Sequence, residues 1–115
     1  MLYISVVIFV ITASAGMTML VLRLRRGKNP PAVLAIVHGI FAACGLVVLT
    51  IAPAVAGLSV KAVIATVLYE FAGMAGFGAA SFHLRGKLLP VYLAAVHASI
   101  AVTATVLLVL GIMAH

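Results

Sequence analysis

Four long stretches of this chain carry almost no charge, and they constrain its fold more than any other feature. They cover residues about 2–22, 31–52, 60–82 and 89–113. Each is long enough to cross a membrane as a helix, which needs about 20 apolar residues. Hydrophobic residues make up 67% of the sequence and charged residues only 7%, so the chain cannot cover its own surface with polar groups. The sequence therefore predicts an all-α transmembrane protein with four spans.

Short turns separate the predicted helices, which favours an up-down-up-down four-helix bundle forming a single membrane domain over residues 1–115. Six of the seven basic residues lie in the first and third turns, and only Lys61 lies on the other side. The positive-inside rule then places both basic turns in the cytoplasm and both termini outside, and we expect a bacterial inner membrane as the location. Charges placed in short turns indicate membrane topology, so the net charge of +6 does not predict binding to nucleic acid.

One stretch of the sequence occurs twice, at an offset of 59 residues. Residues 27–42 read GKNPPAVLAIVHGIFA and residues 86–101 read GKLLPVYLAAVHASIA, so a cationic turn, a proline and one histidine recur in order. We expect two parallel helical-hairpin repeats, about 1–56 and about 60–115, related by a pseudo-twofold axis along the membrane normal. Parallel repeats also occur in transporters, so the duplication does not by itself select a function.

The repeat places His38 and His97 at equivalent depths, about 10 Å from the cytoplasmic ends of the second and fourth predicted helices. These helices are diagonal partners in such a bundle, with axes about 13 Å apart when neighbouring axes lie at 8–10 Å. That span fits two imidazoles with one iron between them. Ligation would also satisfy two polar rings that are costly in a membrane core. Zinc suits the pair less well, because no cysteine or carboxylate completes a four-ligand site.

Small residues flank both histidines at about one helical turn to either side, and they recur on the facing helices. The tripeptide Ala-Gly-Met occurs at residues 15–17 and again at 72–74, and Gly76 and Gly78 follow the second copy on the same predicted helix. A glycine lets a planar group approach the backbone closely, so these positions predict room for a flat macrocycle. Tight packing of membrane helices is the alternative reason for small residues, and it stays open. The candidate lining residues are Ala35, Ala42, Ala94, Ala101, Gly16 and Gly73.

A pair of histidines in a four-span bundle resembles membrane b-type cytochromes, in particular the family whose haems are each held by histidines from two different helices. The resemblance covers the architecture and the two positions His38 and His97, and it implies one haem b per chain. Because the CxxCH attachment motif is absent, the haem would be held without covalent links. That family commonly holds two haems, whereas here His83 lies at a helix end and His115 is the final residue, so a second ligand pair is not predicted.

The resemblance implies one-electron transfer between a quinol or another membrane donor and a redox protein, rather than enzymatic catalysis. His83 and Arg85 are candidates for contact with the cofactor, because haem propionates at this depth would emerge near the cytoplasmic surface. Arginine matches the geometry of a carboxylate. The alternative for the arginines is that they only set the topology at the lipid headgroups.

Glu70 is the only acidic residue and lies near the middle of the third predicted helix. An ionised carboxylate there is costly, so we expect Glu70 to be a proton site or a protonated acid bound to a nearby hydroxyl. The alternative function is therefore a small proton-coupled transporter. Small multidrug resistance transporters are similar in size, although they carry their acid on the first helix. A non-catalytic subunit of a membrane complex fits either reading, and the sequence predicts no particular oligomeric state.

Overall fold

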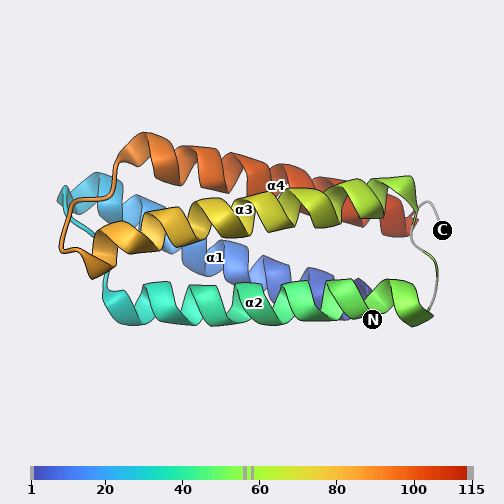
Figure 1. The fold of residues 1–115 in the computed structure, drawn as a ribbon. Helices are drawn as coiled ribbons and strands as arrows, with labels where there is room; N and C mark the ends of the chain where they lie inside the picture. The colour runs from blue at the N-terminus through green and yellow to red at the C-terminus, as the bar shows by residue number, and fades with distance from the viewer. Residues whose placement is uncertain (1, 56, 58, 114–115) are drawn as a thin grey trace.

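The computed structural model describes residues 2–55, 57 and 59–113 and confirms an all-α fold (Figure 1). Four helices follow one another with short connections, and the bundle measures 43 × 19 × 19 Å. Consecutive helices run in opposite directions, so the bundle is up-down-up-down. His115 lies outside the described residues. The helices are α1 (Leu2–Arg26), α2 (Ala32–Val55), α3 (Val60–Leu84) and α4 (Val91–Met113).

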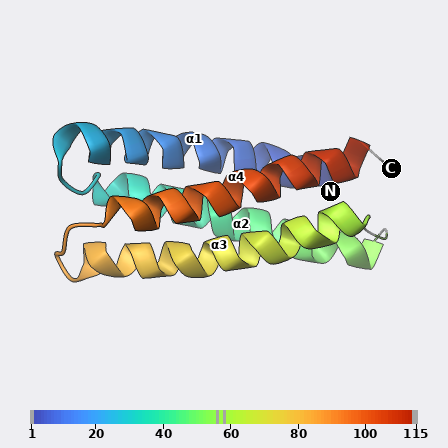
Figure 2. The ribbon, with the colours of Figure 1, turned by 90° about the horizontal axis from the view of Figure 1, so that it is seen from above.

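The helices pack as two hairpins. Helix α1 packs chiefly against α2 and helix α3 against α4, whereas the contacts of α1 with α4 and of α2 with α3 are less extensive. Helices α2 and α4 are therefore diagonal partners, as are α1 and α3. Figure 2 shows that the α1–α2 and α3–α4 turns lie together at one end, and that both termini lie at the other end. The weaker contacts divide the bundle into two halves, with one histidine-bearing helix in each.

The helix ends differ from the predicted ones by a few residues. Helix α1 continues past the predicted end at residue 22 to Arg26, because cations in a last turn interact favourably with the free carbonyls there. Helix α2 passes through Pro53, which the sequence pattern takes as its end, and stops at Val55. Membrane helices tolerate such a proline, since the freed backbone groups can find other partners. Pro31 immediately precedes α2, and its carbonyl accepts from the Ala35 N–H at 3.3 Å.

Gly27 and Gly86 end the first and third helices in the same backbone conformation, with φ of 65° and 66°. This left-handed conformation favours glycine because a Cβ atom would be strained there. The N–H of Gly27 donates to the carbonyl of Arg23 at 3.2 Å, and the N–H of Gly86 donates to that of His83 at 3.2 Å. The Gly-Lys pair that recurs in the sequence therefore begins each basic turn.

Hydrogen bonds join the two basic turns to each other. The Asn29 side chain donates from Nδ2 to the carbonyl of Lys87 at 2.7 Å and accepts the N–H of Leu89 at 2.8 Å. Arg23 donates from Nε to the carbonyl of Leu89 at 2.9 Å. These bonds connect residues of different hairpins, so the halves of the bundle are held together at the cationic end.

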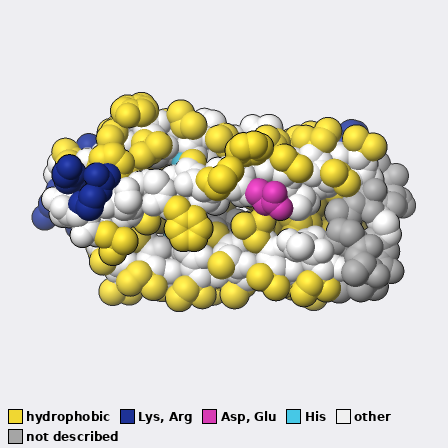
Figure 3. Space-filling model, in the orientation of Figure 1, with side chains coloured by type: hydrophobic (Ala, Val, Ile, Leu, Met, Phe, Trp, Pro, Cys, Tyr) yellow, Lys and Arg dark blue, Asp and Glu magenta, His cyan; other side chains and the backbone are white. Residues whose placement is uncertain are grey.

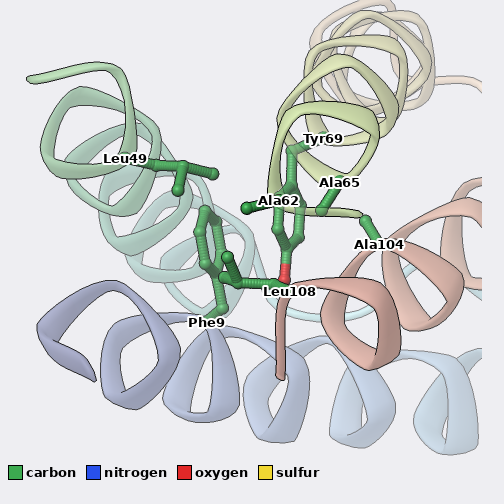
Figure 4. Packing of buried hydrophobic residues seen from close by; sticks show 7 residues of the cluster. All are labelled: Phe9, Leu49, Ala62, Ala65, Tyr69, Ala104 and Leu108. Atoms are coloured by element: carbon green, nitrogen blue, oxygen red, sulfur yellow. The ribbon is translucent and has the colours of Figure 1, made fainter. Parts of the chain in front are cut away.

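The buried hydrophobic core lies in the half of the bundle away from the basic turns, and its side chains are shown from close by in Figure 4. Phe9 of α1 and Tyr69 of α3 stack across the bundle, with ring centroids 3.9 Å apart and planes 8° apart. Leu49 of α2 and Leu108 of α4 are fully buried beside them. Small side chains fill the remaining space. These are Ala62, Ala65 and Ala104.

The outer surface is largely apolar along the helices, apart from the cationic end, Lys61 at the start of α3 and one acidic side chain (Figure 3). Each of the four helices is long and apolar enough to cross a membrane. Large hydrophobic side chains such as Val7, Ile40 and Phe77 are exposed, which only a lipid environment or another protein accommodates. The protein is therefore a transmembrane four-helix protein that resides in a lipid bilayer.

Candidate functional site

His38 of α2 reaches across its own hairpin to the backbone of α1. Its Nδ1–H donates to the carbonyl of Thr12, with a distance of 2.9 Å between nitrogen and oxygen. A carbonyl oxygen only accepts, so the ring proton lies on Nδ1. The ring lies directly over Gly16, because a Cβ atom at that position would be 2.9 Å from Cε1 of His38. Gly16 therefore admits the imidazole to the backbone of α1.

His97 of α4 makes the corresponding contacts in the other hairpin. Its Nδ1–H donates to the carbonyl of Ala72 on α3 at 2.8 Å. The ring lies over Gly76, where an added Cβ atom would be 3.2 Å from Cε1 of His97. Both histidines are half-buried and both carry the ring proton on Nδ1.

A single feature of helix geometry explains both contacts. The glycine in each half follows the accepting residue by four positions, as Gly16 follows Thr12 and Gly76 follows Ala72. In an α-helix the N–H of the later residue donates to the carbonyl of the earlier one. A carbonyl has two lone pairs, so it can also accept the histidine where no side chain covers it. Glycine leaves that second lone pair open.

The two imidazoles meet between the hairpins. Their ring centroids are 6.0 Å apart, and the ring planes are inclined at 75°. Within the described part of the chain, neither Nε2 atom has a hydrogen-bond partner. No buried side-chain nitrogen or oxygen there lacks a partner, so both Nε2 atoms remain accessible from outside the packed core. Each ring therefore keeps one free lone pair.

The two glycines predicted to line the site have different positions. Gly16 lies against His38, as described. Gly73 does not lie against His97, because an added Cβ would meet only Leu46 Cδ1, at 3.7 Å. The counterpart of Gly16 in the second hairpin is therefore Gly76, and the lining role of Gly73 stays a prediction. The sequence feature that distinguishes Gly76 is its position four residues after Ala72, whose carbonyl faces α4 and accepts the bond from His97.

The four alanines of the predicted lining are all half-buried on α2 and α4, about one turn to either side of the histidines. Among residues 2–55, 57 and 59–113, no three histidine, cysteine, aspartate or glutamate side chains are grouped so that they could hold a metal ion. The site therefore offers two ligands from the protein. The alanines are Ala35, Ala42, Ala94 and Ala101.

His83 and Arg85 lie at the cationic end and do not join the two central histidines. His83 donates from Nε2 to the carbonyl of Pro30 at 2.9 Å, which adds another bond between the hairpins. Arg85 donates to the carbonyl and the hydroxyl of Ser81, each at 3.2 Å, and its guanidinium lies 4.9 Å from the centre of the Phe82 ring. Both side chains thus have local structural partners.

Glu70 points away from the interior. It is exposed on α3, and none of the hydrogen bonds found among the described residues involves it. An open groove of about 590 Å³ follows α1 on the side of α4, with Ser14, Met17 and Thr105 in its wall. Glu70 lines neither this groove nor the smaller one beside Ser99.

Comparison with protein-family models, with curated proteins and with solved structures finds no match for this chain. The class of protein therefore rests on the fold and on the geometry of the two histidines.

Proposed function

We propose that this chain is a membrane cytochrome of the b type. It binds one haem b non-covalently through His38 and His97 and transfers single electrons within a bilayer. One observation carries the proposal: two imidazoles from diagonal helices each donate Nδ1–H to a backbone carbonyl and each keep a free Nε2.

This hydrogen-bond pattern is the one that metal-binding histidines use. A ligating histidine almost always donates its other ring N–H to a carbonyl, a carboxylate or water, which fixes the tautomer and makes the ligating nitrogen more basic. The carbonyls of Thr12 and Ala72 have this role here. A histidine that served only to join helices would gain by using both nitrogens, since an unpaired polar group is costly in a membrane.

The spacing of the rings fits one metal between them. Two imidazoles on opposite sides of a metal, each with a metal–nitrogen bond of about 2 Å, have ring centroids about 6 Å apart. The observed separation is 6.0 Å. Two protein ligands suit a metal whose other positions are filled by a macrocycle, whereas zinc needs four ligands. The limited contact between hairpins and the half-buried alanines support a flat group at this place.

A haem held by His38 and His97 would supply a reversible one-electron couple. The residues of the chain have separate tasks. His38 and His97 hold the group, the carbonyls of Thr12 and Ala72 orient the rings, and Gly16 and Gly76 give the rings access to those carbonyls. The apolar helices around them exclude water. A quinol or a redox protein completes the transfer.

We also propose that the bundle consists of two parallel copies of one hairpin. The matching conformations of Gly27 and Gly86 and the matching bonds of the two histidines support this. The clustered cations support an orientation with both basic turns in the cytoplasm of a bacterium and both termini outside. The proton-coupled transporter gains no comparable support, because Glu70 faces outward and lines neither groove.

The test is a visible spectrum of the detergent-purified protein, oxidised and then reduced with dithionite. We expect sharp α and β bands on reduction in the parent protein, and their loss in His38→Ala and in His97→Ala. The matched control is His83→Ala, which removes a histidine that bonds to Pro30 and should keep the bands. A pyridine haemochrome assay then gives the haem type and the number of haems per chain.

The spectra are interpretable only if each variant folds, so circular dichroism and size-exclusion chromatography accompany them. A folded protein that stays colourless after incubation with haemin would refute the proposal. Bands that survive in both single variants would place the haem elsewhere.

A further inference from the structure

Glu70 occupies an unusual position for the only acidic side chain of a membrane protein. It lies well inside the span of α3, and it faces outward among exposed hydrophobic side chains (Figure 3). Within the described residues it has no hydrogen bond and no ion pair. Ionisable residues inside a membrane nearly always face protein or water, because lipid offers them no partner. The outer face of α3 therefore calls for a protein surface against it.

Helix α3 is also the helix least suited to lipid. Its best membrane-spanning window has a mean hydropathy of 1.5, compared with 2.3, 2.5 and 2.2 for α1, α2 and α4. A helix that is less apolar than its neighbours is better placed at a contact between proteins than in lipid.

The exposed face of α3 has a regular pattern. Large exposed side chains recur at intervals of three and four residues along it, which forms one straight stripe on a helix. Glu70 lies in the middle of the stripe. The other members, which we call the Glu70 stripe together with Glu70, are Val63, Val67, Met74 and Phe77.

We propose that the Glu70 stripe is the interface between two copies of this chain in the membrane. Two copies share one orientation in a bilayer, so a twofold axis along the membrane normal brings each residue close to its own counterpart. A carboxylic acid both donates and accepts, and two Glu70 side chains therefore complement each other through an O–H···O bond. No lysine or arginine lies near this depth in the described helices to offer an ion pair instead.

This interface is independent of the proposed haem. The stripe lies on the outer face of α3, whereas the histidines meet between the hairpins. Each copy would hold its own pair of imidazoles, so loss of the dimer should leave haem binding intact, and loss of haem binding should leave the dimer intact.

Disulfide cross-linking in membranes tests the interface directly. In a Cys44→Ser background, a single cysteine is introduced by Met74→Cys on α3 or by Met17→Cys on α1. Met17 is the matched control, because it is the same residue type, 53% exposed compared with 61% for Met74, and lies on the diagonal helix. With copper-phenanthroline as oxidant, we expect a covalent dimer from Met74→Cys and none from Met17→Cys.

Substitution of Glu70 itself gives a second measurement. Glu70→Gln keeps a side chain that donates and accepts, so the dimer measured by analytical ultracentrifugation in detergent should persist. Glu70→Leu removes the bond and should weaken the dimer about tenfold, as expected for one hydrogen bond between membrane helices. Equal cross-linking at both methionines, or no cross-linking along the stripe, would overturn the proposal. So would an unlike subunit recovered in place of a second copy, or a dimer that Glu70→Leu leaves unchanged.

Discussion

The α1–α2 hairpin and the α3–α4 hairpin hold their histidines by the same contacts, although the residues around those contacts differ. His38 bonds to the carbonyl of a threonine, Thr12, and His97 to the carbonyl of an alanine, Ala72. The side chain of the accepting residue is therefore irrelevant to the bond. Both halves need a backbone carbonyl that no neighbouring side chain covers, and both provide it with a glycine.

The aromatic layer, formed by the stacked rings of Phe9 and Tyr69 further along the bundle, is less symmetrical. The Phe9 ring packs onto Gly45, where an added Cβ would be 2.9 Å from two ring carbons. Tyr69 instead donates its hydroxyl to Thr105 Oγ1 at 2.6 Å, since the Thr105 hydroxyl already donates to the Ala101 carbonyl. The two aromatic side chains therefore have different neighbours, whereas the two histidines make the same contacts in both hairpins.

The largest effect is expected where the hairpins match in the core. Leu49 and Leu108 are both fully buried, so Leu49→Ala and Leu108→Ala should each lower the free energy of unfolding by about 3 kcal/mol through the cavity that they leave. Equilibrium unfolding in mixed micelles measures both. Because the two side chains are equally buried, a difference of several kcal/mol between them would break the equivalence of the hairpins.

The glycines that lie against the two histidines should differ in how much stability an alanine substitution costs. Gly16→Ala places a methyl group 2.9 Å from the His38 ring, and the crowding should cost about 2 kcal/mol of unfolding free energy. Gly76→Ala meets the His97 ring at 3.2 Å, where a shift of a few tenths of an ångström relieves the contact. The gain of about 1 kcal/mol in helix propensity should then leave that variant close to the parent.

Unfolding in mixed micelles again gives the free energies, and Gly78→Ala is the control. An added Cβ at Gly78 meets nothing within 4 Å, so this variant reports helix propensity alone. If Gly16→Ala were as stable as Gly78→Ala, the close contact of His38 with α1 would be wrong.

Much of this architecture follows from local features of the sequence. Apolar runs of membrane length specify the four helices, and the Gly-Lys turns with their flanking prolines specify where the chain reverses. The equal spacing of His38 and His97 from those turns is enough to predict that the two rings lie at one depth on diagonal helices. Each of these inferences needs only distances along one helix.

The remaining features depend on how one helix lies against another. Placing Gly76 rather than Gly73 against His97 requires the register of α3 against α4, which distances along one helix do not give. The outward orientation of Glu70 likewise depends on which face of α3 packs inward. All faces of these helices are apolar, so the hydrophobic pattern that reveals the buried face of a soluble helix is nearly absent.

A smaller effect is expected from removing the one polar difference in the aromatic layer. Tyr69→Phe makes that position match Phe9 and removes the bond to Thr105, which should cost about 1 kcal/mol of unfolding free energy. Thr105→Val removes the same bond from the other side. The double variant should cost little more than either single one, and additive costs would show that the two groups do not interact.

The smallest effect should come from the residue whose carbonyl holds His38. Thr12 donates its own hydroxyl to the carbonyl of Ile8 at 2.8 Å, within α1, so its side chain does not reach the histidine. Thr12 is buried, so Thr12→Ala loses some packing, but the higher helix propensity of alanine offsets part of that loss, and the unfolding free energy should change by less than about 1 kcal/mol. The Nδ1–H signal of His38 in a nitrogen-15 NMR spectrum should stay in place, because Ala72 already provides the same carbonyl to His97. A displaced signal would mean that the threonine side chain orients the ring and that the two hairpins bind their histidines differently.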